Sequence, residues 1–226
     1  MAETRTVPAP GGLQFHCRIW GPDDGVPVLL LHGVTGSGAA WERVADALGP
    51  RWRIYAPDMR GHGASSRPGD YSFEAMRDDV LALMDALGVP EAVLVGHSMG
   101  GIAAYLLAAA RPERVSGLVL VETPPPVPLG RPAPVRPEGE LDYDWELRPQ
   151  IIAQLNAPSE AWWKGLSAIT AQTLVVSGGD QSFLPGERVL EMTAEIPWGL
   201  LTEIPVGHDV VAAAPERLAA AIGDLF

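Results

Sequence analysis

Residues 91–110 read EAVLVGHSMGGIAAYLLAAA, and this stretch decides how the rest of the sequence is interpreted. It begins as an apolar run typical of a buried β-strand and continues as a run of small and apolar residues typical of a helix. Between the two runs stands GHSMG, at positions 96–100. A serine at such a sharp strand-to-helix turn has its hydroxyl oxygen exposed above the sheet. We therefore predict that Ser98 is an exposed nucleophile, flanked by glycines because a Cβ atom would collide with the neighbouring segments.

Strand-like and helix-like runs alternate along most of the chain, as they do in proteins that cover a parallel sheet with helices. We predict strands at residues 13–20, 26–33, 52–58, 92–98, 115–122, 173–179 and 199–205. We predict helices at residues 41–48, 73–88, 99–110, 187–195 and 215–225. The first strand alternates in character and is expected at the antiparallel edge of the sheet. The pattern indicates an α/β fold in a single domain over residues 1–226.

The alternation stops between residues 123 and 168. Prolines are frequent from Pro124 to Pro137, and since proline lacks a backbone N–H group, this segment is excluded from the sheet interior. We expect an insertion that lies over one end of the sheet. Its tryptophans Trp145, Trp162 and Trp163 are candidates for a substrate-binding apolar ceiling, but large aromatic side chains equally serve to attach such a segment to the core.

The charge and composition exclude several classes of partner. With a net charge of −12, the chain lacks the basic surface that binding to nucleic acid or to an anionic membrane requires. The single cysteine, Cys17, excludes an intrachain disulfide. The first ten residues hold no apolar signal-peptide region, and no apolar run approaches the roughly 18 residues that span a bilayer. We therefore expect a cytoplasmic protein whose partner is a small-molecule substrate.

A serine hydroxyl needs a base to become a nucleophile, and histidine is the usual base because its pKa lies near neutral pH. Of the five histidines, His208 stands in the loop VGHDV between the last predicted strand and the last predicted helix. Loops at the carboxyl ends of parallel strands form the crevice in which ligands bind. His97 is adjacent to Ser98, but successive side chains leave a strand on opposite faces. His208 is therefore the predicted base.

Five motifs spread over nearly the whole chain resemble the α/β-hydrolase superfamily. They are HGVTGS at 32–37, DMRGHGAS at 58–65, GHSMGG at 96–101, SGGD at 177–180 and GHD at 207–209. The resemblance implies a mostly parallel sheet of eight strands, or slightly fewer, with helices on both faces, and it identifies residues 123–168 as a short lid. It also implies an oxyanion hole formed by the backbone N–H groups of Val34 and Met99, which stabilise the negative oxygen of an acyl-transfer intermediate. It implies no metal and no organic cofactor.

A carboxylate must hold the histidine in the correct tautomer, and two candidates remain open. The usual family position is the loop after the seventh strand, where Asp180 stands. Family loops often read Gly-x-x-Asp, but the residue three positions after Gly178 is Gln181. Some family members carry the acid after the sixth strand, where Glu122 precedes a run of prolines. The sequence therefore offers both Asp180 and Glu122 as the third catalytic residue.

The predicted function is hydrolysis of small, partly apolar carboxylic esters or lactones through an acyl-enzyme on Ser98. Two alternatives use the same residues, namely hydrolysis of a C–C bond and cofactor-free perhydrolase activity, because fold and triad do not fix the substrate. A third alternative is a receptor-like protein that binds a ligand with little turnover. The lid sequence shows no cluster of arginines that would demand a phosphorylated or polyanionic substrate. Monomer and homo-oligomer are equally open.

Overall fold

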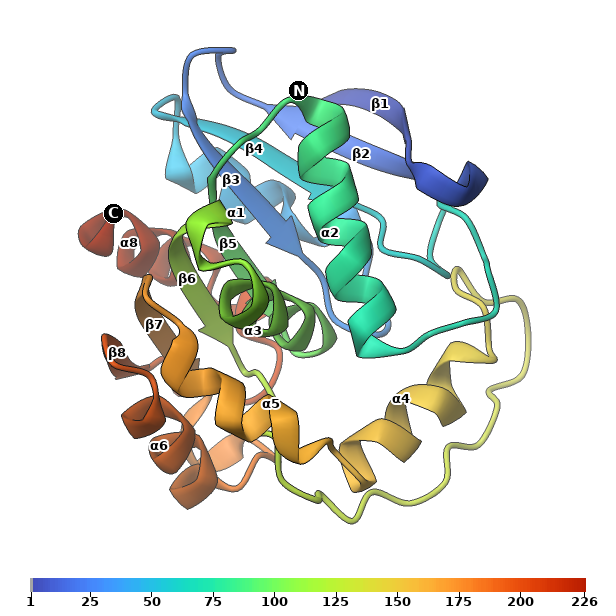
Figure 1. The fold of residues 1–226 in the computed structure, drawn as a ribbon, viewed down its shortest axis with the longest axis vertical. Helices are drawn as coiled ribbons and strands as arrows, with labels where there is room; N and C mark the ends of the chain where they lie inside the picture. The colour runs from blue at the N-terminus through green and yellow to red at the C-terminus, as the bar shows by residue number, and fades with distance from the viewer. Residues whose placement is uncertain (1) are drawn as a thin grey trace.

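The computed structural model describes residues 2–226 and contains one open sheet of eight strands flanked by helices (Figure 1). The strands are β1 (Glu3–Pro8), β2 (Gln14–Trp20), β3 (Val26–Leu31), β4 (Trp52–Pro57), β5 (Ala92–His97), β6 (Val115–Val121), β7 (Gln172–Ser177) and β8 (Gly199–Glu203). Their spatial order is β1-β2-β4-β3-β5-β6-β7-β8. β2 is antiparallel to both of its neighbours, and all pairs from β4 to β8 are parallel. The predicted α/β fold with a mostly parallel sheet is confirmed.

The antiparallel edge of the sheet differs from the prediction. The edge strand is β1, which pairs with β2 from Glu3 opposite Ile19 to Pro8 opposite Gln14. The strand predicted at residues 13–20 is therefore the second strand of the sheet. β1 escaped prediction because only Val7 of its residues is buried, so the apolar alternation that marks a half-buried strand is missing.

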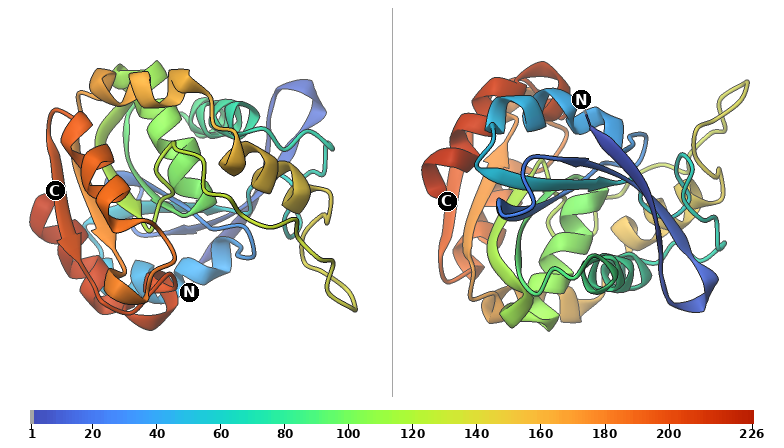
Figure 2. Two further views of the ribbon diagram at one scale, coloured as in Figure 1. Left: turned by 90° about the horizontal axis from the view of Figure 1, so that it is seen from below. Right: turned by 90° about the horizontal axis from the view of Figure 1, so that it is seen from above.

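Helices cover both faces of the sheet (Figure 2). One face packs against α2 (Phe73–Leu87) and α3 (Met99–Ala110), and the other packs against α1 (Glu42–Leu48) and α8 (Pro215–Leu225). The other helices are α4 (Leu147–Asn156), α5 (Glu160–Gly165), α6 (Gly186–Glu195) and α7 (Val210–Ala213), and 3₁₀ turns lie at Pro10–Gly12, Gly38–Trp41, Pro112–Arg114, Leu166–Ala168 and Gly179–Gln181. None of the helices in residues 2–226 combines the length and the apolar character needed to cross a bilayer.

The chain between β6 and β7, which includes the lid at residues 123–168, lies across the carboxyl ends of the strands (Figure 1). It is mostly irregular as far as an isolated bridge between Tyr143 and His62, and it then forms α4 and α5. Two glutamines of α4 accept hydrogen bonds from the backbone at the start of α2. Gln150 binds the Tyr71 N–H group at 3.0 Å, and Gln154 binds the Phe73 N–H group at 2.9 Å. These bonds fix α4 relative to α2.

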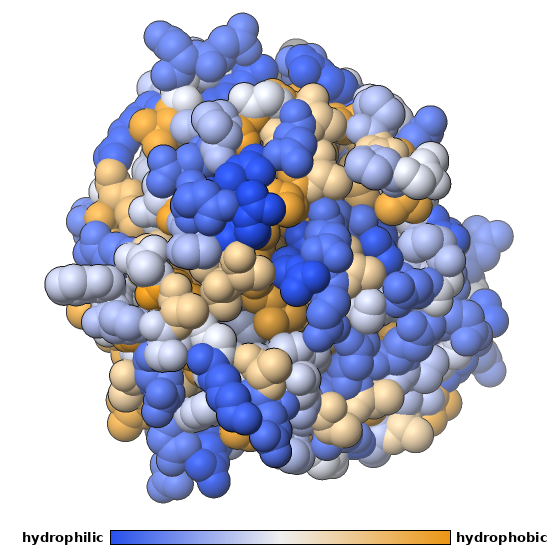
Figure 3. All heavy atoms as spheres, viewed as in Figure 1, coloured by the Kyte–Doolittle hydropathy of each residue, from blue (hydrophilic) through white to orange (hydrophobic). Residues whose placement is uncertain are grey.

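Polar residues dominate the face of the molecule seen in Figure 3. Figure 3 shows the face seen in Figure 1 as mostly hydrophilic, with apolar residues in small groups between the polar ones. Of the large apolar side chains that are exposed, three lie together at the edge of the sheet formed by β8. They are Trp198, Leu200 and Leu201. The carboxyl ends of the strands, where the lid lies, hold a separate apolar pocket, described next.

Candidate active site

Ser98 lies at the sharp turn between β5 and α3. Its backbone has φ 52° and ψ −113°, a strained conformation for a residue with a side chain. Two glycines permit the turn. A Cβ atom on Gly96 would lie 2.5 Å from the Gly100 carbonyl oxygen, and one on Gly100 would collide with the carbonyl oxygen of Leu31 in β3. The close packing of β3, β5 and α3 therefore holds the strained turn, and Ser98 lines the pocket.

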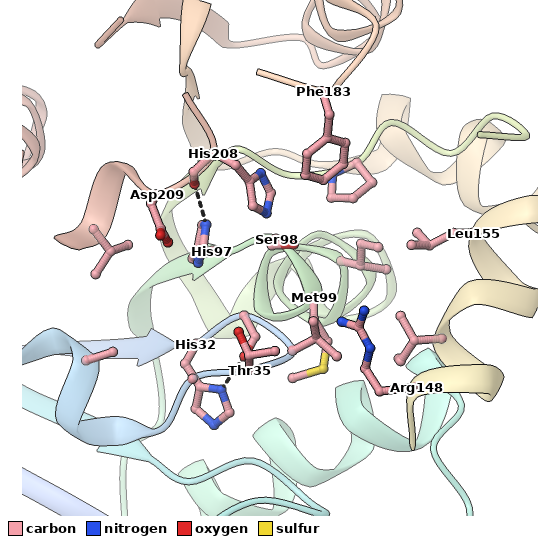
Figure 4. Close-up of a pocket in the computed structure, with 18 of the residues that line it drawn as sticks. His32, Thr35, His97, Ser98, Met99, Arg148, Leu155, Phe183, His208 and Asp209 are labelled. Atoms are coloured by element: carbon pink, nitrogen blue, oxygen red, sulfur yellow. Dashed lines mark hydrogen bonds between the residues drawn. The ribbon is translucent and has the colours of Figure 1, made fainter. Parts of the chain in front are cut away.

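His208 and Glu122 form a hydrogen-bonded pair in this region. His208 lies in the loop after β8, and its Nδ1 atom is 3.0 Å from Oε2 of Glu122, the residue that follows β6. Because an ionised carboxylate only accepts hydrogen bonds, Nδ1 carries the proton and Nε2 keeps a free lone pair. Ser98 and His208 line the same pocket, and Figure 4 shows the imidazole ring turned toward the serine. The arrangement offers the Ser98 hydroxyl a nitrogen base backed by a carboxylate.

Hydrogen bonds keep the buried Glu122 carboxylate ionised. The side chain is 1% exposed, and burial by itself raises a carboxyl pKa. The His208 ring, the Ser182 hydroxyl at 2.5 Å and the Gly178 N–H group at 2.5 Å all donate to it. These donors outweigh burial, so the pKa of Glu122 lies below its usual value. The residue also has a positive φ of 46°, which is a second strained backbone position in this region.

Asp180, the other predicted acid, lies apart from His208. Its side chain is exposed on the turn Gly179–Gln181, and within residues 2–226 it forms no hydrogen bond or ion pair with the histidine. The flanking residues Gly178 and Ser182 instead donate to Glu122. The loop after β7 therefore supplies hydrogen-bond donors to the Glu122 carboxylate and does not supply a carboxylate itself. Sequence reasoning missed Ser182, because no motif distinguishes it from an ordinary loop serine.

Val34 and Met99, the residues predicted to form the oxyanion hole, both line the pocket. In the part of the chain that the structure describes, neither backbone N–H group has a hydrogen-bond acceptor. For Met99 this follows from its position as the first residue of α3, because the first N–H groups of a helix have no intrahelical partner. A free N–H group at a helix N-terminus favours negative charge, so the Met99 donor suits a developing oxyanion, and the Val34 N–H group is the predicted second donor.

Two buried histidines hold the loop that carries Val34. His32 donates from Nδ1 to the Gly33 carbonyl oxygen at 2.8 Å and accepts the Met59 N–H group at Nε2, at 2.9 Å. Burial lowers the pKa of His32 to about 3, so the ring is neutral, as one donor and one acceptor require. On the other side of the loop, Nε2 of His62 lies 2.9 Å from the Val34 carbonyl oxygen. These bonds fix the backbone next to the predicted oxyanion donor.

His97 contacts the backbone of the predicted base. Its Nε2–H group donates to the His208 carbonyl oxygen at 2.9 Å, and the two ring centroids are 4.9 Å apart (Figure 4). Burial lowers the pKa of His97 to about 4, and the nearby His208 ring adds to this effect. A neutral His97 therefore anchors the His208 loop without placing a charge beside the base. Sequence reasoning did not foresee this contact, which joins residues distant in the chain.

The pocket above Ser98 has a volume of about 410 Å³. Its lid side includes the aliphatic residues Ile151, Ile152 and Leu155 of α4. Such a volume suits a small molecule that is partly apolar. Within residues 2–226, no three His, Cys, Asp or Glu side chains are grouped so that they could hold a metal ion.

The three tryptophans proposed from the sequence as substrate-binding residues are not among those that line the pocket. Trp162 is buried against Phe73, with ring centroids 5.5 Å apart, and its Nε1–H group donates to Glu74 at 2.7 Å. Trp163 packs on the outside of the same apolar core, and Trp145 is partly exposed. Trp162 therefore attaches the lid to α2, which is the second role that the sequence left open.

Comparison with known proteins identifies the family. The family described as alpha/beta hydrolase fold matches residues 26–142. The 2-hydroxymuconate semialdehyde hydrolase of Pseudomonas sp. (strain CF600) is 30% identical over 250 residues, which cover 89% of this chain and 87% of that protein. The chain therefore belongs to the α/β-hydrolase fold family.

Other similar proteins agree with this assignment. Lipase LipV of Mycobacterium tuberculosis is 42% identical over 110 residues. The matched segment covers 49% of this chain and 42% of the length of the lipase. The solved structure of the enol-lactonase from Burkholderia xenovorans LB400 superposes with a TM-score of 0.85 over 99% of both chains, at 22% identity. At that identity the superposition establishes a common fold.

Proposed function

We propose that the protein is a serine hydrolase that cleaves small, partly apolar carboxylic esters or lactones through an acyl-enzyme. The observation that carries this proposal is the 3.0 Å hydrogen bond from His208 Nδ1 to the buried Glu122 carboxylate, with His208 and Ser98 lining the same pocket. This bond fixes the tautomer in which Nε2 is free to act as a base. Membership of the α/β-hydrolase fold family supports the same chemistry.

In the first half of the proposed reaction, the Ser98 oxygen attacks the carbonyl carbon of the ester while its proton moves to His208 Nε2. The negative oxygen that forms accepts hydrogen bonds from the N–H groups of Val34 and Met99. The ionised Glu122 stabilises the imidazolium. When the tetrahedral intermediate collapses, the bond to the alcohol oxygen breaks, and that oxygen takes the proton from Nε2. The product of this half is an acyl group on Ser98.

In the second half, a water molecule attacks the acyl carbon and gives its proton to His208 Nε2. The bond to the serine oxygen then breaks, and the serine regains the proton. The net products are one carboxylic acid and one alcohol, or one hydroxy acid from a lactone. Each half needs Nε2 first as a base and then as an acid, which is why the tautomer set by Glu122 is central.

A second candidate function is hydrolysis of a C–C bond by the same residues. It is favoured by the 30% identity to 2-hydroxymuconate semialdehyde hydrolase over most of both chains. Under this alternative, Ser98 reacts with an activated phosphonate probe, but simple esters are turned over poorly. A receptor-like role would give the same labelling and no turnover of either substrate type.

The test is hydrolysis of p-nitrophenyl acetate and butyrate by the native protein and by Ser98→Ala, together with labelling by a fluorophosphonate. The proposal predicts turnover and labelling that are both lost in the variant, with a drop in kcat of ~10⁴ or more. Labelling without ester turnover favours the C–C hydrolase or the receptor. Absence of labelling contradicts an activated serine altogether.

A further inference from the structure

The lid side of the pocket carries two arginines, Arg131 from the coil after β6 and Arg148 from the first turn of α4. Both side chains are half-buried. Within residues 2–226 neither guanidinium group has an ion-pair partner or a hydrogen-bond acceptor, and the hydrogen bonds of these two residues are made by their backbone groups. By contrast, the buried Arg60 is paired with Asp79. The lid side of the pocket thus contains two partly desolvated cations, neither of them paired with a carboxylate of the described residues.

The surrounding structure fixes the position of Arg131. Asn156, at the end of α4, accepts the Arg131 N–H group at 2.6 Å and donates to the Arg131 carbonyl oxygen at 2.7 Å. The guanidinium carbon lies 4.4 Å from the centroid of the Phe183 ring, in cation–π geometry. The centroid of that ring is in turn 4.4 Å from the centroid of the His208 ring. One aromatic ring therefore separates the Arg131 charge from the proposed base.

The position of Arg148 is fixed by its helix. Its neighbour Leu147 and the next turn, at Ile151, are buried in the main apolar core. Figure 4 shows the Arg148 side chain reaching from α4 toward Met99 and Ser98. The backbone of both arginines and the Arg131 guanidinium group are therefore positioned before any ligand arrives, which reduces the entropy lost on binding.

Among the residues that the structure describes, one carboxylate lines the pocket. It belongs to Asp209, which is exposed, and Figure 4 shows it on the opposite side of Ser98 from Arg148. The pocket is therefore polarised, with its positive charge on the lid side and its negative charge beside the His97 ring. A cationic lid side is unexpected in a chain whose net charge is −12. In a pocket with apolar walls, such charges act with little screening and select ligands of opposite charge.

We propose that the substrate carries a carboxylate group at the end of the molecule that faces the lid, where Arg148 and Arg131 bind it. This inference rests on the proposed function and narrows it to esters or lactones that bear a second, free carboxylate. A guanidinium group binds a carboxylate through two parallel hydrogen bonds, and the partial burial of the site strengthens them. The presence of two arginines in this pocket also corrects the expectation from the sequence that the lid offers no arginine cluster. The two arginines are separated in the chain, and the fold of the lid brings both to one pocket.

The experiment compares two substrates whose acyl chains have equal carbon numbers, mono-p-nitrophenyl glutarate and p-nitrophenyl valerate. The native protein is expected to prefer the glutarate ester in kcat/KM. In Arg148→Gln and in Arg131→Gln, the glutarate-to-valerate ratio of kcat/KM should fall roughly 10- to 100-fold, mainly through KM, as expected for loss of a charged hydrogen bond. Arg136→Gln is the matched control, since Arg136 is exposed on the same lid and does not line the pocket, and its ratio should equal that of the native protein.

A second measurement needs no variant. Raising the salt concentration should increase KM for the glutarate ester and leave KM for the valerate ester unchanged, because salt screens the ion pair alone. Equal ratios in the native protein and both pocket variants, with both esters still hydrolysed through Ser98, overturn the carboxylate site and leave the proposed function intact. If neither ester is hydrolysed and Ser98 is not labelled, the proposed function fails, and the carboxylate site falls with it.

Discussion

The substitution Glu122→Gln removes the charge behind His208 while keeping the size of the side chain. In the native protein, Oε1 of Glu122 accepts the Gly178 N–H group, and Oε2 accepts both the Ser182 hydroxyl and the His208 Nδ1–H group. A glutamine has one oxygen and one NH₂ group, and the Gly178 donor requires the oxygen on its side. The NH₂ group then faces His208 and donates to Nδ1, which moves the ring proton to Nε2. Nε2 is thereby prevented from accepting the Ser98 proton.

The expected loss is large. Trapping a triad histidine in the wrong tautomer lowers kcat by about 10⁴, which corresponds to about 5 kcal/mol of transition-state stabilisation. The assay is kcat for p-nitrophenyl butyrate, with thermal unfolding measured on the same samples to show that the variant folds. The matched control is Asp180→Asn, the same change of carboxylate to amide at the exposed acid on the neighbouring loop. Its kcat should equal that of the native protein.

Two results would refute this reasoning. One is a folded Glu122→Gln variant whose kcat is within about tenfold of the native value, since a triad acid accounts for far more. The other is a large loss in Asp180→Asn while Glu122→Gln remains active. That second result would require the loop after β7 to rearrange and bring Asp180 to His208 during the reaction.

Three further predictions follow from the contacts described. Ser182→Ala removes one hydrogen-bond donor to the Glu122 carboxylate and should lower kcat roughly tenfold. The reason is that a hydrogen bond to a charged group contributes about 1.5–3 kcal/mol. An unchanged kcat would show that this donor is dispensable. Trp162→Phe should lower the free energy of unfolding by about 1–2 kcal/mol through loss of the bond to Glu74, with no change in the preference between acetate and butyrate esters. A shift in that preference would place the indole ring in the pocket. Thermal stability should fall as the pH drops from about 6.5 to about 4. In the folded protein the pKa of His32 is lowered to about 3 and the pKa of His97 to about 4. The unfolded chain therefore binds more protons than the folded protein in this pH range, and protonation favours unfolding. His97→Gln should reduce this pH dependence, and an unaltered dependence would contradict the burial effect.

Much of the fold was predictable because its signals are local. The apolar runs of β3 and β5 and the GHSMG turn each specify their own conformation, and they place Ser98 without reference to distant residues. β1 was not predictable in this way, because its pairing with β2 stabilises a strand whose own residues are almost all exposed.

The acid and the lid were harder to predict because they depend on how separate loops meet. His208 contacts Glu122 and not Asp180 because of the close approach of the loops after β7 and β8, where the Gly207 N–H group donates to the Gly178 carbonyl oxygen at 2.9 Å. That approach directs the Gly178 N–H group and Ser182 to Glu122 and leaves Asp180 exposed. Neither local periodicity nor motif spacing carries this information.

The central claim is that Ser98 forms a covalent acyl intermediate with the help of His208. Rapid mixing with p-nitrophenyl butyrate, followed by acid quenching and intact-protein mass spectrometry, tests it most directly. We expect a transient species heavier by one butyryl group, mapped by peptide analysis to Ser98, absent in Ser98→Ala and formed far more slowly in His208→Gln. Ester hydrolysis without any acylated protein, or an acyl group mapped to another residue, would contradict the claim.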